Sequence, residues 1–168
     1  MALYTTNNKL NATPSQTNLA TTFTAAGQIL SLTAATTSGN ATLRRAFIYE
    51  FDIGADGLPN TTDCAIQWDI SRQTSLGTGV SMQVNPLDPV DAVTGTIATG
   101  NYTIAAIITA TSSVFQLAAN QRASYRWVVN PGGPGELVIP NTNVNGLMIR
   151  ALSSTYASTV QASANFRE

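Results

Sequence analysis

The 168-residue chain contains no histidine and a single cysteine, Cys64. Without histidine, the sequence excludes histidine-based catalytic triads and the usual zinc sites, and one cysteine permits no intrachain disulfide. Cys64 alternates with the apolar residues Ile66 and Trp68, so we expect a buried, inert thiol rather than a nucleophile. We therefore expect no enzymatic activity, no cofactor and no metal, and a fold that is stabilised by packing.

Charged side chains are also scarce, at 10% of the chain with a net charge of −1, whereas an average globular protein has about 25%. Such a neutral surface gives little repulsion between molecules and favours burial against a partner. A secreted β protein with no obligate partner is the alternative. Lys9 is the only lysine and the seven arginines are scattered, so no basic stripe is present and we do not expect nucleic acid as a partner.

Long apolar runs are absent as well. The longest candidate, residues 104–110, is interrupted by Thr109 and is much shorter than the ~20 residues that a membrane-spanning helix needs. The first residues show neither an export signal nor an Arg-rich transit pattern. We therefore expect one domain with no membrane association, made in the cytoplasm of its host cell.

Carboxylates are the remaining groups that are able to carry chemistry. Three of them, Asp52, Asp56 and Asp63, surround a Gly-rich loop where oxygen ligands would suit calcium. However, Gly54 stands where an EF-hand loop needs Asp or Asn. We therefore expect an Asp-Gly turn rather than a calcium site.

A second carboxylate pair, Asp88 and Asp91, lies in a Pro-rich segment. Two such acids are able to cleave a glycosidic bond, but in this context they more often form turns. The Gly-rich residues 130–135 lack the Lys-Ser or Lys-Thr of a phosphate-binding loop. We expect turns at both places.

Apolar and polar residues alternate with period two in five segments, and helical patterns are nearly absent. These segments are residues 45–52, 63–72, 101–110, 123–130 and 159–168. The alternation predicts strands with one buried face. In the third segment the expected inward residues are Tyr102, Ile104, Ala106 and Ile108. The side chains expected in the core are Phe47, Phe51, Ile66, Trp68, Tyr125, Trp127 and Phe166.

Gly, Pro and Asn clusters separate these segments, which predicts an all-β fold: a two-sheet antiparallel sandwich of about eight strands, with jelly-roll or related Greek-key topology. Residues 117–122 fit either a helical turn or a strand. Residues 1–40 are rich in Thr, Asn, Ser and Ala, which predicts an extended N-terminal arm or edge strands ahead of a β-sandwich domain at residues 41–168.

Six residues are candidates for contacts with a partner. Three are apolar anchors in the expected arm, and three are arginines within or beside strands, where arginine is able to make bidentate contacts with carboxylates. They are Leu10, Leu19, Phe23, Arg122, Arg126 and Arg150. Exposed arginines without partners are the alternative for the last three.

Several segments resemble small virion proteins of tailed bacteriophages. They are RAFIYEFDIG at 45–54, ISRQTSLGTG at 70–79, PLDP at 86–89, NQRASYRW at 120–127, PGG at 131–133, NGL at 145–147 and the stretch from Tyr156 to Phe166. The chain is similar to head decoration (cement) proteins over residues 44–168. The resemblance implies a site on the outer capsid surface, where such proteins bridge neighbouring capsid subunits.

From this resemblance we expect a virion protein with the major capsid protein as its partner and self-association as a trimer or dimer. The alternative is a phage fibre or adhesin-type module that binds a receptor or carbohydrate. Glycan binding usually needs exposed aromatic rings, whereas Trp68 and Trp127 fall on the expected inward faces. A capsid or tail-tube subunit is a third option, but a coat protein that contacts the genome is expected to carry a basic arm.

Overall fold

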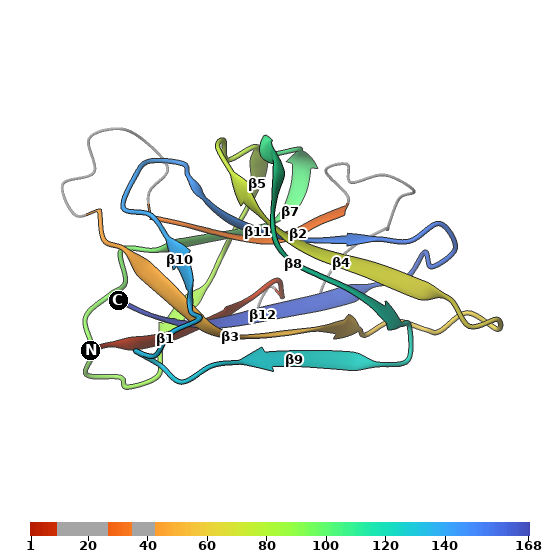
Figure 1. Ribbon diagram of the computed structural model, residues 1–168, viewed down its shortest axis with the longest axis horizontal. Helices are drawn as coiled ribbons and strands as arrows, with labels where there is room; N and C mark the ends of the chain where they lie inside the picture. Colours follow the sequence, from red (N-terminus) through yellow and green to blue (C-terminus); the bar gives the residue numbers. More distant parts are fainter. Residues whose placement is uncertain (10–26, 35–42) are drawn as a thin grey trace.

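The computed structural model describes residues 1–9, 27–34 and 43–168 of the chain. Its regular elements in these ranges are twelve β-strands, which form two antiparallel sheets that face each other (Figure 1). Each sheet packs its apolar face on the other, which removes both faces from water. The strands are β1 (Leu3–Asn7), β2 (Gln28–Thr33), β3 (Ala46–Ala55), β4 (Ala65–Gln73), β5 (Thr78–Met82), β6 (Val84–Pro86), β7 (Ile97–Ile104), β8 (Ile108–Asn120), β9 (Ser124–Val128), β10 (Leu137–Ile139), β11 (Gly146–Leu152) and β12 (Val160–Arg167).

The strand order has jelly-roll topology. The first sheet runs β10-β3-β12-β1-β6, with β9 also beside β3, and the second runs β5-β7-β2-β11-β4-β8. Four antiparallel pairings are nested in the sequence: β1 with β12, β2 with β11, β3 with β9 and β10, and β4 with β8. Successive pairings alternate between the two sheets, as in an antiparallel ribbon that is rolled up. The prediction of an all-β antiparallel sandwich is confirmed.

The structure has more strands than the eight or so expected, because β5, β6 and β7 are inserted between β4 and β8. Strand β6 pairs with β1 in the first sheet, while β7 pairs with β2 and β5 in the second. The insertion therefore widens both sheets on the same side as β1 and β2. The opposite side, formed by β8 and β9, keeps the edges of the simple jelly roll.

One large hydrophobic core lies between the sheets. The predictions for Phe51, Ile66, Trp68 and Phe166 are confirmed, since each is at most 1% exposed. Phe166 stacks on Tyr4 of β1 with the ring centroids 5.4 Å apart. Buried aromatic rings of this kind contribute much of the apolar area that stabilises a sandwich.

The prediction that Phe47 lies in the core is wrong, and a bulge in β3 is the reason. The pairing of β3 with β12 skips Tyr49, which has no partner on β12. An extra residue reverses the alternation of faces, so Ile48 is buried before the bulge and Phe51 after it. Phe47 is left half-buried, and the guanidinium of Arg167 covers its ring at 4.0 Å from the centroid.

The single strand expected at 101–110 is divided, because β7 ends at Ile104 before β8 begins. Asn101 has a φ of 50°, a left-handed conformation that Asn tolerates better than most residues. Beyond it, Tyr102 is buried and its hydroxyl is hydrogen-bonded to that of Ser31, while Ile104 is 62% exposed rather than inward. Burial raises the pKa of Tyr102 to about 12.

Strand β4 follows its predicted alternation but not its predicted exposure. Asp69 and Ser71 point away from the core as expected, yet each is only 1% exposed, because the start of β8 covers this face of the sheet. Cys64, just before the strand, is half-buried rather than buried and accepts a long hydrogen bond from Asn60.

Two parts of the expected N-terminal arm are integral strands. Strand β1 lies between β12 and β6, and β2 lies between β7 and β11 with every residue buried. Residues 3–7 and 28–33 therefore belong to the sandwich. Three expected anchors, Leu10, Leu19 and Phe23, lie outside the described residues, and the arm stays a prediction for their segment.

Candidate interaction surface

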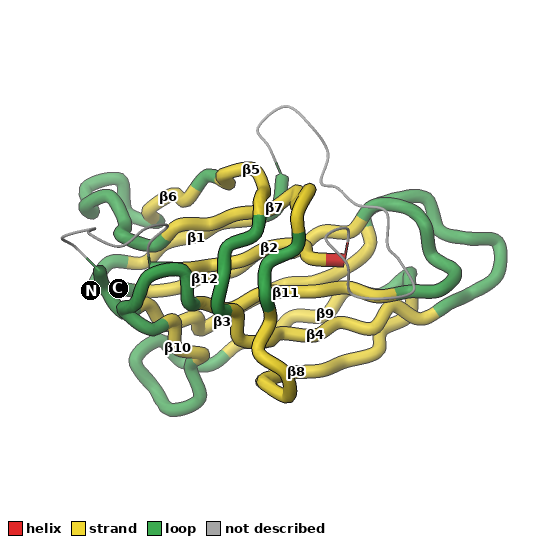
Figure 2. Tube along the Cα trace, turned by 90° about the horizontal axis from the view of Figure 1, so that it is seen from above, coloured by secondary structure: helices red, strands yellow, loops and turns green. Residues whose placement is uncertain are grey.

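Strand β8 forms one edge of the second sheet, with β4 on its inner side (Figure 2). Its 13 residues, ITATSSVFQLAAN, include no charge, no proline and no glycine. No described strand pairs with its outer side. Natural edge strands are usually protected by charge, proline or short length. Because β8 has none of these, its free N–H and C=O groups suit pairing with a strand of another chain.

Half-buried aromatic rings lie beside this edge. They are Phe115 on β8 and Tyr125 and Trp127 on β9. Phe51 of the core joins them, with ring centroids 5.0 Å from Trp127 and 5.2 Å from Phe115, and Phe115 lies 5.6 Å from Tyr125. The prediction that Tyr125 and Trp127 are core residues is wrong, because β9 is an edge strand and its rings line the open side of the sandwich. We call β8 and β9 together the β8–β9 edge.

Arg122 and Arg126 lie on this edge, and both are paired. The Nε of Arg122 donates to Asp63 Oδ1 over 2.8 Å, and the Nε of Arg126 donates to Glu50. These hydrogen bonds hold the pKa of Asp63 and of Glu50 below their ordinary values. The two arginine side chains are 52% and 61% exposed. Exposed ion pairs are weak, so both guanidinium groups stay accessible to a partner.

Arg150 lies elsewhere, on the outer face of the second sheet, so the structure does not join it to the other two arginines. Its Nε and Nη2 donate to Asp69 Oδ2 over 2.9 and 2.6 Å. Burial opposes ionisation of Asp69, but hydrogen bonds from Ser113, Ser71, Arg150 and Gln116 outweigh it and hold the pKa of Asp69 below its ordinary value. With its side chain only 16% exposed, Arg150 has a structural position.

The chemistry of the β8–β9 edge is that of adhesion: apolar rings, free backbone groups and guanidinium donors. The described residues contain no group of three or more His, Cys, Asp or Glu side chains that is able to hold a metal ion. Within the same ranges, no helix is long and apolar enough to cross a membrane. Of the aspartates near the Gly-rich loop, Asp56 is paired with Lys9 and Asp63 with Arg122.

No family model matches the chain, and neither a curated protein nor a solved structure matches it. A jelly roll supports many unrelated functions. The function is therefore argued from the exposed residues and edges of this chain.

Sequence reasoning missed the main features of this surface. The alternation in 123–130 was the same as in a central strand, so it gave no sign that Tyr125 and Trp127 lie at an edge. A usable signal was present in residues 108–120, a long β-prone run without charge, proline or glycine. Arg45 and Arg72, which line a cavity at one end of the sandwich, were missed because nothing local distinguishes them from the other arginines.

Proposed function

We propose that this protein is a non-enzymatic structural component of a bacteriophage virion that binds the outer capsid surface and stabilises the capsid lattice. The observation that carries the proposal is the β8–β9 edge, a long uncharged edge strand beside half-buried aromatic rings. An isolated monomer gains nothing from such an edge and risks aggregation. A protein that pairs with a neighbouring subunit covers it.

The low charge and the sequence resemblance support the same role. A protein that binds only the assembled lattice stabilises it by mass action, without chemistry. Repetition of the contact over a closed shell makes a modest affinity effective through multivalency. The partner is the major capsid protein, and the molecule acts at the virion surface as a trimer or dimer.

The direct test is co-sedimentation of the full chain with capsids assembled from the major capsid protein of the same phage. We expect the protein to pellet with the capsids and to raise the temperature at which they open. Ala118→Lys places a charge at an exposed position of β8 and should weaken binding. Leu58→Lys, a change at a loop residue that is 85% exposed, is the matched control and should bind as the wild type does.

Failure of the wild-type protein to pellet with intact capsids would contradict the proposal. If the wild type binds and Ala118→Lys binds equally well, capsid binding stands but the β8–β9 edge is not the contact.

The half-buried Tyr125 and Trp127 also favour a second candidate, a carbohydrate-binding module of a fibre or adhesin. One face of the Trp127 ring is already stacked against Phe51 at 5.0 Å, so only part of the ring is open to a sugar. Glycan-array binding by the full chain, lost in Trp127→Phe while capsid binding is absent, would support this candidate instead.

A further inference from the structure

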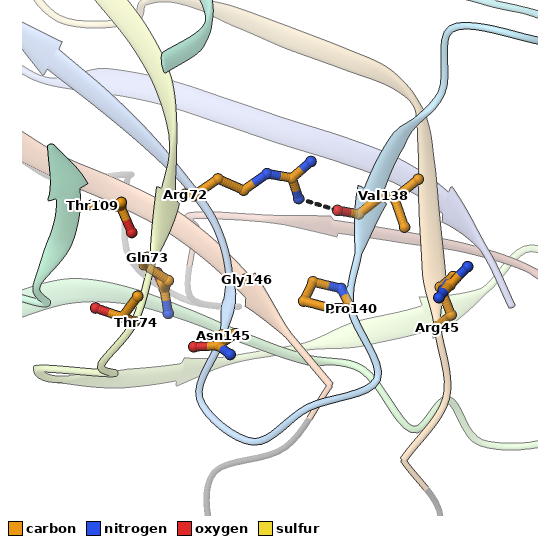
Figure 3. A pocket seen from close by; sticks show the side chains of 9 residues that line it. All are labelled: Arg45, Arg72, Gln73, Thr74, Thr109, Val138, Pro140, Asn145 and Gly146. Atoms are coloured by element: carbon orange, nitrogen blue, oxygen red, sulfur yellow. Dashed lines mark hydrogen bonds between the residues drawn. The ribbon is translucent and has the colours of Figure 1, made fainter. Parts of the chain in front are cut away.

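A cavity of about 380 Å³ lies between the two sheets at one end of the sandwich (Figure 3). Its walls come from both sheets, since Arg72 belongs to β4, Val138 to β10 and Gly146 to β11. Val138 and Pro140 supply an apolar surface. Arg72 and Arg45 supply positive charge, with Arg45 exposed to solvent just before β3.

Arg72 is a half-buried cation with few partners. Figure 3 shows its side chain reaching from β4 to β10, where Nη1 donates to the carbonyl oxygen of Val138. A guanidinium has five N–H donors, and this is the one hydrogen bond that the described residues provide to them. Burial lowers the pKa of Arg72 because the charged form loses hydration. A desolvated charge without a counter-charge is costly.

The charge inventory of the chain leaves this cavity unbalanced. All nine Asp and Glu side chains lie in the described ranges. Five of them form ion pairs, with Lys9, Arg122, Arg126, Arg150 and Arg167. The cationic side chains left over are Arg44, Arg45 and Arg72, and none has a carboxylate within ion-pair distance. The cavity therefore lacks an anion that the chain itself does not supply.

A second unpaired group indicates what kind of anion fits. Gln73 lines the same cavity and is 1% exposed, and its side-chain Oε1 has no hydrogen-bond partner among the described residues. A buried acceptor of this kind needs an N–H or O–H donor. A peptide segment with an acidic side chain offers both a carboxylate and backbone N–H groups. A simple inorganic anion offers only the charge.

The connection between β6 and β7 has the matching chemistry. Asp88 is exposed, has no ion-pair partner among the described residues, and accepts a hydrogen bond at Oδ1 from the Val90 N–H. Leu87 and Val90 beside it are 51% and 89% exposed, and Val93 is 90% exposed. This connection lies next to β6, toward the end of the molecule that holds both termini (Figure 2). It therefore presents one unpaired carboxylate among exposed apolar side chains.

We propose that the cavity is a carboxylate-binding site and that its occupant is Asp88 of a second copy of this chain. In the contact, Leu87 and Val90 of the second copy pack against Val138 and Pro140, while the carboxylate meets Arg72. Because two different surfaces meet, the contact is heterologous and builds rings or filaments rather than a two-fold dimer. It is a contact between copies, so it goes beyond the proposed capsid role and holds or fails separately from it.

The test is sedimentation of the full chain at protein concentrations up to about 1 mM, since a small single contact binds weakly. We expect the wild type to self-associate, and Asp88→Asn and Arg72→Gln each to weaken association by about thirtyfold or more. The double variant should associate no more weakly than either single variant, because both changes remove the same contact. Asp91→Asn, in the same connection, is the matched control and should associate as the wild type does.

Two further measurements decide between outcomes. If Arg72→Gln does not fold, Arg45→Gln at the exposed rim replaces it. Titration with sodium acetate, followed by NMR, tests the cavity itself, and we expect acetate to bind the wild type and to compete with self-association. Acetate binding without any effect of Asp88→Asn would overturn the second copy as the occupant. A wild type that stays monomeric and binds no acetate would overturn the whole proposal.

Discussion

Asp69 and Arg150 show how one pair of side chains holds the outer face of the second sheet. The Asp69 carboxylate is 1% exposed and accepts hydrogen bonds from Arg150, Ser71 and Gln116. A buried charge is tolerated only when it is paired and hydrogen-bonded in this way. Arg150 is therefore required for folding of this region, independently of any contact with a partner.

We expect Asp69→Asn to lower the free energy of unfolding by about 3 kcal/mol near neutral pH, because it leaves Arg150 without its counter-charge. The folded-state pKa of Asp69 is below its ordinary value. Its contribution is therefore present above the unfolded pKa of about 3.9 and is lost as the pH falls through the lower folded pKa. Urea denaturation at neutral and strongly acidic pH measures this. Asp63→Asn, in an exposed pair, serves as the control with little change, and an Asp69→Asn effect equal at both pH values would refute the assignment.

Strand β1 has a larger role than its place in the Thr- and Asn-rich N-terminal segment suggests. It fills the space between β12 and β6, and Tyr4 is 1% exposed in the core. The Tyr4 hydroxyl donates to the carbonyl oxygen of Ala92 over 2.8 Å, which ties β1 to the connection between β6 and β7. Removal of this strand would leave β12 and β6 without a neighbour.

We expect Tyr4→Ala to cost about 3–5 kcal/mol of folding free energy, since it leaves a cavity beside Phe166. Tyr4→Phe keeps the ring and loses only the hydrogen bond to Ala92, so it should cost about 1 kcal/mol. Thermal and chemical denaturation followed by circular dichroism give both values. If Tyr4→Ala is as stable as the wild type, β1 is a dispensable arm after all.

The molecule as a whole is held by pairings between distant parts of the chain. Strand β12 lies between β3 and β1, and its residues Ala162, Ala164 and Phe166 are fully buried or nearly so. None of the nested pairings closes until both ends of the chain are present. A sandwich of this kind is one cooperative unit and folds slowly, because loop closure precedes most of its stabilising contacts.

We therefore expect one unfolding transition that is the same by tryptophan fluorescence and by circular dichroism, and refolding over milliseconds to seconds. Truncation before β12 should abolish that transition, since it exposes the core faces of β3 and β1. Stopped-flow refolding and equilibrium denaturation of the two chains provide the measurement. Two separate transitions in the intact chain would show that the insertion of β5–β7 folds on its own.

The sequence determined the class of fold and most of its inward faces. Period-two alternation is local, so it identified β4 and β12 and placed Ile66, Trp68 and Phe166 in the core. The lack of histidine and the low charge are likewise properties of composition, and they narrowed the chemistry without any structure.

The tertiary structure alone decided which strands are edges, where a bulge reverses the faces and which arginines lack partners. Tyr125 and Trp127 alternate like core residues but lie on an edge strand, and Phe47 is turned outward by an unpaired residue in β3. Arg72 and Arg150 are alike in sequence, yet only Arg150 meets a carboxylate. These outcomes depend on register between segments far apart in the chain, and pairing at that distance is set by the packing of the complete sandwich rather than by any local pattern.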